Sequence, residues 1–186
     1  EQEQILSLRQ REERFAFEGL KERPIPSLLR RFSAPVVLDY PYTEDELLHL
    51  MAHDDDPFSR WEASQRLAAA TILQKGGKPS AAVLQAAKNA LADPDAAFAA
   101  EMLALPSETF LAEQMEVVDP DALHAARNAL RKALAKALAA ELASRYRVLA
   151  SKGPYSPDAA SAGKRALRNL CLSYLAEIGF TALAYE

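Results

Sequence analysis

Cysteine and histidine are scarce in this 186-residue sequence. Cys171 is the single cysteine, so the chain can form no internal disulfide; this suits a reducing compartment and leads us to expect a cytoplasmic protein. No apolar run approaches the roughly 18 residues of a membrane-spanning helix, and no signal peptide opens the sequence. These absences exclude a disulfide-rich scaffold and argue against a membrane partner.

An excess of positive charge is missing as well. Lysine and arginine number 22 against 26 aspartates and glutamates, which gives a net charge of −4. A mildly acidic chain gives no reason to expect nucleic acid as a partner. The 6 glycines form no phosphate-binding loop, and none of the 3 histidines has neighbours that would complete a serine–histidine–aspartate set.

The composition divides the chain into two parts, residues 1–42 and residues 43–186. Alanine is rare in the first part and abundant in the second. The first part carries four prolines, which exclude a long helix, and its β-branched and aromatic runs predict short strands at 5–8, 15–17 and 36–40. Two or three strands cannot bury a sheet face alone. We therefore expect them to belong to a β-sandwich completed by strands that this chain lacks, or to lean on the helices.

Helix start signals recur through residues 43–186. Thr43 and Glu46 form a capping box, and Asp or Ser stands directly before proline at positions 56–57, 93–94, 119–120 and 156–157. The polar side chain can accept from free amide groups, and proline takes the first helical position, where it needs no N–H. Together with weaker signals, this pattern predicts helices at 43–53, 57–75, 80–92, 94–104, 107–116, 120–151 and 157–178.

These elements predict a mainly α fold, with antiparallel helix pairs stacked in an α-solenoid-like, superhelical array that a short β segment precedes. The spacing of the helix starts is too irregular for a repeat of fixed period. The helix over 120–151 should be long and straight. Leucines at 123, 130, 134, 138 and 142 form its apolar stripe, and small alanines between them permit close helix packing.

His49 and His53 stand four residues apart, so both imidazoles lie on one face of the first helix, close to the acidic run 54–56. A zinc protease needs a glutamate directly after the first histidine and a third ligand downstream, whereas Leu50 follows His49 here. The catalytic pattern therefore fails. A surface pair beside an acidic helix end is the favoured interpretation, and adventitious zinc or nickel binding is the alternative.

Other chemically notable residues have structural interpretations. Cys171 lies between leucines and is interpreted as a small buried hydrophobe rather than a nucleophile. Trp61 shares a helix face with Phe58 and is expected in the core with its indole N–H paired. Basic residues at 127, 131, 132, 136, 145, 147, 164, 165 and 168 are interpreted as a solvated or interdomain face. We therefore assign no catalytic, cofactor-binding or metal-ligating residue.

Several segments resemble the bacterial aminopeptidase N (alanyl aminopeptidase) family of zinc metallopeptidases. Residues 24–36, PIPSLLRRFSAPV, resemble the end of that family's small β-sandwich domain, and residues 58–65, FSRWEASQ, resemble the start of its helical C-terminal domain. Weaker similarity follows at 101–107, 119–120 and 164–171. The resemblance covers essentially the whole chain, with residues 1–42 as the last sandwich strands and residues 43–186 as the first part of the helical domain.

The resemblance implies a parent enzyme that removes N-terminal amino acids from peptides, with zinc held by a histidine–glutamate–two-residue–histidine motif and a downstream glutamate. This sequence contains no such motif, so no zinc ligand or catalytic residue is carried over. The helical domain of the family packs over the catalytic domain of the same polypeptide and encloses a cavity. We therefore expect a non-catalytic fragment that acts as a lid or wall, and the charged start and apolar end of the sequence suggest a piece of a longer protein.

Two other functions are considered. An independent helical scaffold that binds a peptide or protein in a concave groove should end in polar capping helices. This chain instead opens on strand-like sequence and ends on apolar residues at 180, 183 and 185, which favours the aminopeptidase interpretation. A nucleic-acid-binding helical protein would depend on the basic stretch alone.

Overall fold

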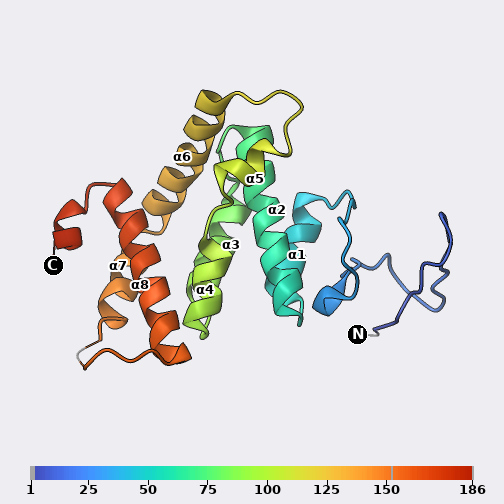
Figure 1. Cartoon of the computed structure of the whole chain (residues 1–186), viewed down its shortest axis with the longest axis horizontal. Helices are drawn as coiled ribbons and strands as arrows, with labels where there is room; N and C mark the ends of the chain where they lie inside the picture. The colour runs from blue at the N-terminus through green and yellow to red at the C-terminus, as the bar shows by residue number, and fades with distance from the viewer. Residues whose placement is uncertain (1–2, 152, 186) are drawn as a thin grey trace.

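The computed structural model describes residues 3–151 and 153–185, and over these ranges it contains eight α-helices, two short 3₁₀ helices and no strand (Figure 1). The elements are η1 (Arg30–Phe32), α1 (Glu44–His53), α2 (Pro57–Lys75), α3 (Ala81–Leu91), α4 (Ala96–Leu103), α5 (Glu108–Ala112), α6 (Pro120–Ala137), α7 (Ala139–Val148), α8 (Ala159–Glu177) and η2 (Thr181–Tyr185). The fold is therefore mainly α, as predicted. None of the helices described is long and apolar enough to cross a membrane.

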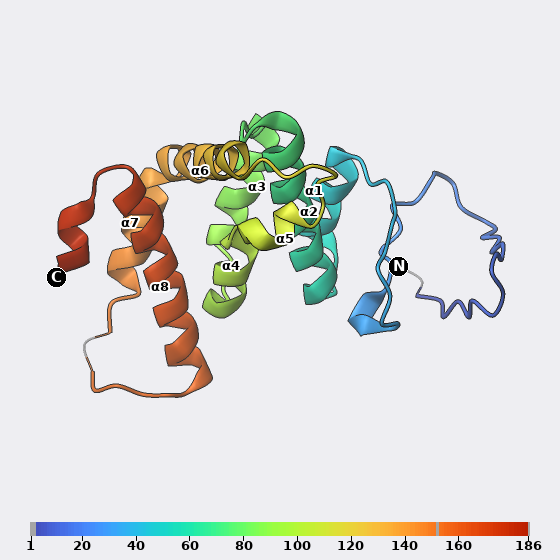
Figure 2. The same ribbon diagram turned by 45° about the horizontal axis from the view of Figure 1, so that its top comes forward.

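The helices form a row with the N-terminal segment at one end and α7 and α8 at the other (Figure 1). The most extensive contacts join α1 to α2, α4 to α8, and α7 to α8. Helix α6 lies along the top of the row in Figure 2, and it contacts α2, α3 and α8. The core runs along the row and is made mainly of leucine and alanine.

The expected strands at 5–8, 15–17 and 36–40 are absent from the described residues, and this expectation is corrected. A strand exists only where its amides and carbonyls pair with a neighbour, and nothing in residues 3–42 pairs with these runs as a ladder. Most of their apolar side chains are exposed, and Val37 has 97% of its surface accessible. Residues 33–43 instead run as an irregular segment beside α1 and α2 (Figure 1).

Side-chain caps fix most helix starts. At α1 the Thr43 hydroxyl accepts from the Glu46 amide at 3.2 Å and the Glu46 carboxylate accepts from the Thr43 amide at 2.9 Å, which confirms the capping box. Two predicted starts shift along the chain: α4 begins at Ala96 with Asp95 as its cap, and α8 begins at Ala159 capped by Asp158. In both cases the acid after proline is the cap, so the proline lies outside the helix.

The predicted long helix over 120–151 is wrong, because it divides at Leu138 into α6 and α7. Leu138 has φ −109° and ψ 13°; its amide still donates to Leu134 O at 3.0 Å, and its carbonyl accepts from Leu142 at 2.8 Å. Neither proline nor glycine marks the break. Packing decides it, because α6 crosses α2 and α3 whereas α7 runs along α8. The leucine stripe continues through the break, and all five of its members are buried.

Two glycines mark the closest backbone approaches. A Cβ built on Gly77, in the turn after α2, would lie 2.0 Å from the Ala126 carbonyl oxygen of α6. A Cβ on Gly163 of α8 would lie 3.0 Å from the Ala97 amide nitrogen of α4. The predicted close packing of small residues is therefore present, and it sets the α2–α6 and α4–α8 spacings.

Candidate functional site

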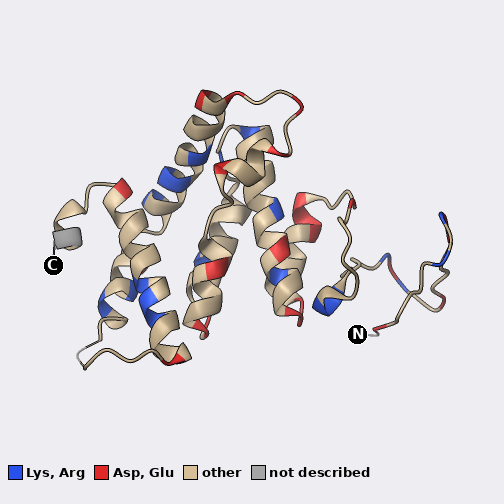
Figure 3. Cartoon of the chain, viewed as in Figure 1, with Lys and Arg blue, Asp and Glu red and all other residues tan. Residues whose placement is uncertain are grey.

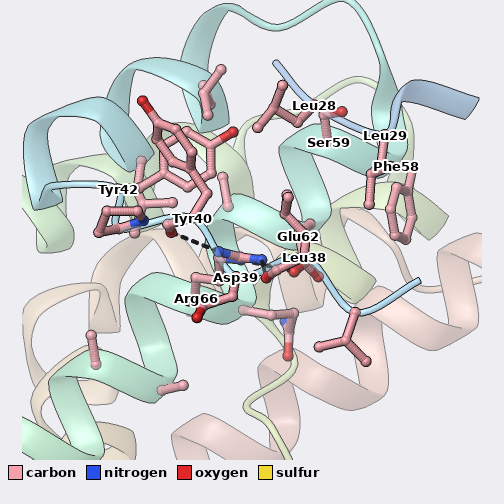
Figure 4. Close-up of a pocket in the computed structure, with 18 of the residues that line it drawn as sticks. Leu28, Leu29, Leu38, Asp39, Tyr40, Tyr42, Phe58, Ser59, Glu62 and Arg66 are labelled. Carbon is pink, nitrogen blue, oxygen red and sulfur yellow. Dashed lines mark hydrogen bonds and ion pairs between the residues drawn. The ribbon is translucent and has the colours of Figure 1, made fainter. Parts of the chain in front are cut away.

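The main concave feature of the described residues is a cleft of about 970 Å³ between the segment 27–42 and helices α1 and α2 (Figure 4). Its walls are mostly apolar and include Leu28, Val36, Leu47, Leu50, Phe58 and Leu73. Phe110 of α5 and Gln114 beyond it close the far side. The cleft therefore follows the line along which the N-terminal segment meets the helical row.

Arg66 of α2 fastens this segment to the helices. Its Nη2 donates to Leu38 O at 2.8 Å and its Nη1 to Tyr40 O at 3.3 Å (Figure 4). Its Nε donates to Glu62 one turn earlier at 2.9 Å, an i,i+4 ion pair that orients the guanidinium. One planar side chain thus holds two carbonyls of a segment that has no strand partner.

Tyr42 provides a second attachment. Its hydroxyl donates to Pro26 O at 2.7 Å, and its ring lies 4.4 Å from that of Tyr40 and below the Arg66 guanidinium at 5.6 Å. Burial raises the pKa of Tyr42 to about 12, and the nearby Arg66 opposes that rise only in part. The phenol therefore stays a neutral donor, which joins the two ends of the segment 26–42.

Arg30 provides a third attachment, to the turn between α1 and α2. Its Nη1 donates to Asp54 Oδ1 at 2.8 Å and its Nη2 to Asp55. This hydrogen bond from Arg30 holds the pKa of Asp55 below its ordinary value. The Asp54 side chain is 1% exposed, so this ion pair is largely shielded from water. We call Arg30 with Asp54 and Asp55 the acidic-turn latch.

Asp56 holds the strained backbone beside the latch. Its carboxylate accepts from the Arg31 amide at 3.1 Å and from the Ser59 hydroxyl at 2.9 Å. Although burial favours the neutral acid, these bonds hold the pKa of Asp56 below its ordinary value. Left-handed φ values of 55°, 53° and 55° occur at Leu29, Arg31 and Phe32. Such residues cost energy in this region, so the surrounding contacts must hold them there.

Aromatic side chains also pack between residues 24–36 and residues 58–65, the two segments on which the family resemblance mainly rests. The Phe32 ring lies 3.9 Å from that of Phe58, and Phe58 lies 5.6 Å from Trp61. Trp61 is only partly buried, so its expected place in the core is corrected. We call the contact region formed by residues 26–42 with the start of α2 and the acidic turn the junction.

The residues considered as metal ligands do not converge. His49 and His53 are exposed on α1 with ring centroids 4.9 Å apart, whereas Asp54, Asp55 and Asp56 are bonded to residues 30, 31 and 59. Within residues 3–151 and 153–185, no group of three or more His, Cys, Asp or Glu side chains could hold a metal ion. The sequence places both sets near one helix end, but in the structure the three acids are bonded to the segment 30–31 and to Ser59.

Cys171 is fully buried in α8, as predicted, and burial raises the pKa of its thiol to about 11. A thiol that stays protonated is a poor nucleophile. The side chain therefore serves packing between α8 and its neighbours.

The basic stretch is not a single solvated face, because its residues at 127, 131, 145, 165 and 168 are partly buried, whereas the interdomain alternative stays a prediction. Lysines and arginines are spread over several helices with acids among them (Figure 3). Several arginines donate to backbone carbonyls of neighbouring helices or of the loops between helices. The bonds are Arg127 Nε to Pro106 O at 2.8 Å, Arg131 Nη2 to Ser173 O at 3.0 Å, Arg145 Nε to Leu91 O at 2.9 Å and Arg168 Nε to Tyr146 O at 3.3 Å.

Sequence reasoning missed Arg66, Tyr42 and Arg30 as the residues that hold the junction. The sequence does indicate an i,i+4 ion pair for Arg66, because Glu62 stands one helical turn before it. No comparable signal marks its acceptors, since they are backbone carbonyls. Arg30 lies inside the segment singled out at 24–36, yet its partners could not be inferred from sequence spacing.

Comparison with known proteins places these features in a family context. Residues 44–185 match a family described as a domain of unknown function (DUF3458_C) with ARM repeats, and residues 1–41 match one described as a domain of unknown function (DUF3458) with an Ig-like fold. Aminopeptidase N of Escherichia coli (strain K12) is 38% identical, over 97% of this chain and 22% of that protein. Aminopeptidase N of Caulobacter vibrioides is 41% identical, over 92% of this chain and 21% of that protein.

A solved structure agrees with the sequence relatives. The crystal structure of Legionella pneumophila aminopeptidase A in complex with aspartic acid matches 89% of this chain and 21% of that chain, with a TM-score of 0.78 and 32% identity. The chain therefore spans about a fifth of the length of each of these relatives.

Proposed function

Because the chain belongs to the aminopeptidase N family, covering its Ig-like end and its ARM-repeat helical region, we propose that it is a non-catalytic part of a zinc-dependent aminopeptidase. In this proposal residues 1–42 are the last strands of the β-sandwich, and residues 43–186 begin the superhelical domain of antiparallel helix pairs. The helical part forms a lid or wall over the catalytic domain of the same polypeptide, whose substrates are peptides with a free N-terminus.

The junction carries this proposal. A wall is useful only if it is held at a fixed position. Arg66 and Arg30 tie the N-terminal segment to α2 and to the turn after α1, and Tyr42 holds the two ends of that segment together. These bonds end on backbone carbonyls and on acids of the turn, so they fix position without adding a reactive group. Rigid attachment of this kind restricts which peptides can reach a cavity, and it does no chemistry itself.

The residues present do not fit a zinc centre of the family type. The sequence lacks the histidine–glutamate–two-residue–histidine motif, and the described side chains include no three-ligand cluster. No step of peptide hydrolysis is therefore assigned to this chain. In the proposed larger enzyme, the zinc and its bound water would belong to the catalytic domain.

The first test concerns activity. The purified 186-residue chain, supplied with zinc, should release no product from an alanine anilide substrate above the rate with buffer alone. Escherichia coli aminopeptidase N assayed in parallel is the positive control. Zinc-dependent release by the chain itself would refute a non-catalytic role.

The second test concerns the wall. In the longer polypeptide that the proposal requires, Arg66→Ala removes the bonds to Leu38 and Tyr40, while Arg147→Ala changes an exposed arginine away from the junction. We expect Arg66→Ala to change the ratio of activities on a long peptide and on the small anilide, and Arg147→Ala to leave it unchanged. Equal ratios in both variants would contradict a role for the junction in substrate access.

The cleft favours a second candidate function, an independent scaffold that binds a peptide or protein partner. Its apolar walls and its volume of about 970 Å³ suit a short hydrophobic segment. A scaffold of this kind would bind its partner with the 186-residue chain alone. Binding that needs the longer polypeptide would instead support the lid or wall.

A further inference from the structure

The histidine pair on α1 takes no part in the junction. His49 and His53 are both exposed, one helical turn apart, with ring centroids 4.9 Å apart and planes tilted by 50°. The third histidine, His124, lies elsewhere and is bonded through Nδ1 to Glu108 and through Nε2 to Asn128. The pair on α1 therefore offers two neighbouring imidazoles to a ligand from solvent.

The helix that carries the pair is held firmly. Its first turn is fixed by the capping box, and its last turn by the hydrogen bond from the Asp54 amide to Leu50 O at 3.0 Å. Leu47, Leu50 and Met51 bury its opposite face, and α1 makes extensive contact with α2. Two ligands on a rigid element lose little conformational freedom when they bind one ion, which lowers the cost of chelation.

The chemistry of the pair selects the ion. Neutral imidazole suits Zn²⁺, Ni²⁺ and Cu²⁺, whereas Mg²⁺ prefers oxygen ligands. The carbonyl end of a helix also favours positive charge, and His53 is the last residue of α1. The nearby Asp54, Asp55 and Asp56 are already bonded to Arg30, Arg31 and Ser59, each through one carboxylate oxygen.

We propose that His49 and His53 form a two-ligand site for a borderline divalent ion, with Ni²⁺ and Zn²⁺ as its test ions. The site has two protein ligands, and water fills the remaining positions. The site does not rest on the proposed function. Because His53 directly precedes Asp54 of the acidic-turn latch, a bound ion would also stiffen the turn on which the latch is built.

The test uses the 186-residue chain without a histidine tag. Isothermal titration with Ni²⁺ should show a single ion per chain, and Mg²⁺ should give no binding heat. His49→Gln or His53→Gln should weaken Ni²⁺ binding by at least about tenfold, since even the loss of a partner outside the ligand shell commonly costs that much. His124→Gln is the matched control and should bind as the parent chain does.

The variants should keep their fold, because both histidines are exposed and glutamine is a good helix former. Circular dichroism checks this directly. A second measurement avoids mutation: Zn²⁺ added to the parent chain should shift the imidazole NMR signals of His49 and His53 together and leave those of His124 in place. Absence of Ni²⁺ binding by the parent chain, or full binding by either pair variant, would overturn the proposal.

Discussion

The close approach of the α2–α3 turn to α6 predicts a large difference between two adjacent glycines. Gly76 and Gly77 have left-handed φ values of 58° and 77°. Nothing lies within 4 Å of a Cβ built on Gly76, whereas one on Gly77 would lie 2.0 Å from Ala126 O and 2.9 Å from Leu130 N. Replacing either glycine by alanine lowers the free energy of unfolding, because alanine disfavours left-handed backbone. Only at Gly77 does the new Cβ also collide with the backbone of α6.

The magnitudes separate the two substitutions. Left-handed backbone costs an alanine about 1–2 kcal/mol, so Gly76→Ala should lower the free energy of unfolding by about that amount. Gly77→Ala adds a collision with backbone, which can be relieved only if α6 retreats by more than about 1 Å from its packed position. Overpacking of this kind costs about 1–3 kcal/mol. The total for Gly77→Ala is therefore about 2–5 kcal/mol, a large share of the roughly 5–15 kcal/mol that stabilises a typical domain.

Urea unfolding followed by far-ultraviolet circular dichroism measures both variants against the parent chain. Gly76→Ala is the matched control, because φ is positive at both positions and both substitutions add the same methyl group. A gap of about 1–3 kcal/mol between the two variants is expected, with Gly77→Ala the less stable. Equal destabilisation would refute the close packing of α6 on the turn, and the α2–α6 geometry with it.

Two further predictions concern the arginine bonds and the junction. Arg145→Ala removes the bond from α7 to Leu91 O at the end of α3 and should lower the free energy of unfolding by about 2 kcal/mol. Arg147 is exposed, so Arg147→Ala should lower it by less than about 0.5 kcal/mol. Urea unfolding measures both variants, and equal losses of stability would contradict the role of Arg145. Burial raises the pKa of Tyr42 in the folded chain to about 12, whereas a tyrosine in the unfolded chain ionises at about pH 10. The stabilisation from the neutral phenol is therefore fully present below about pH 10 and is lost as the pH rises from there towards 12. The melting temperature should therefore fall less steeply over this window in Tyr42→Phe than in the parent chain, and identical slopes would contradict the buried phenol.

Helix positions were predictable because the physics of a helix start is local. A capping side chain satisfies amides two or three residues away, so Thr43, Ser80 and Asp119 could be assigned from neighbouring residues alone. The errors at α4 and α8 have the same local origin. Both sites offer two successive candidates around a proline, and the second one caps the helix in each case.

Strand formation in residues 3–42 was not predictable from these residues, because it depends on partners distant in sequence or outside it. The β-branched and aromatic runs meet the side-chain requirement of a strand, yet a strand also needs a neighbour for its backbone. The match of residues 1–41 to an Ig-like family agrees with the side-chain pattern, whereas the described structure has no ladder. The resemblance of residues 24–36 thus predicted the family of this segment, whereas composition did not predict its conformation in this chain.

The arginine bonds show most clearly why the candidate site could be predicted only in part. A carboxylate partner leaves a trace in the sequence, as Glu62 does for Arg66, but a backbone carbonyl is offered by every residue and leaves none. The last carbonyls of a helix lack partners within it, so each helix end is an acceptor for any guanidinium that the fold brings near. Arg145 donates to such an acceptor at Leu91, the last residue of α3, whereas Arg127 donates to Pro106 in the loop between α4 and α5. Both acceptors lie far from their donors in the sequence, so the helical pattern over 120–151 could predict neither contact.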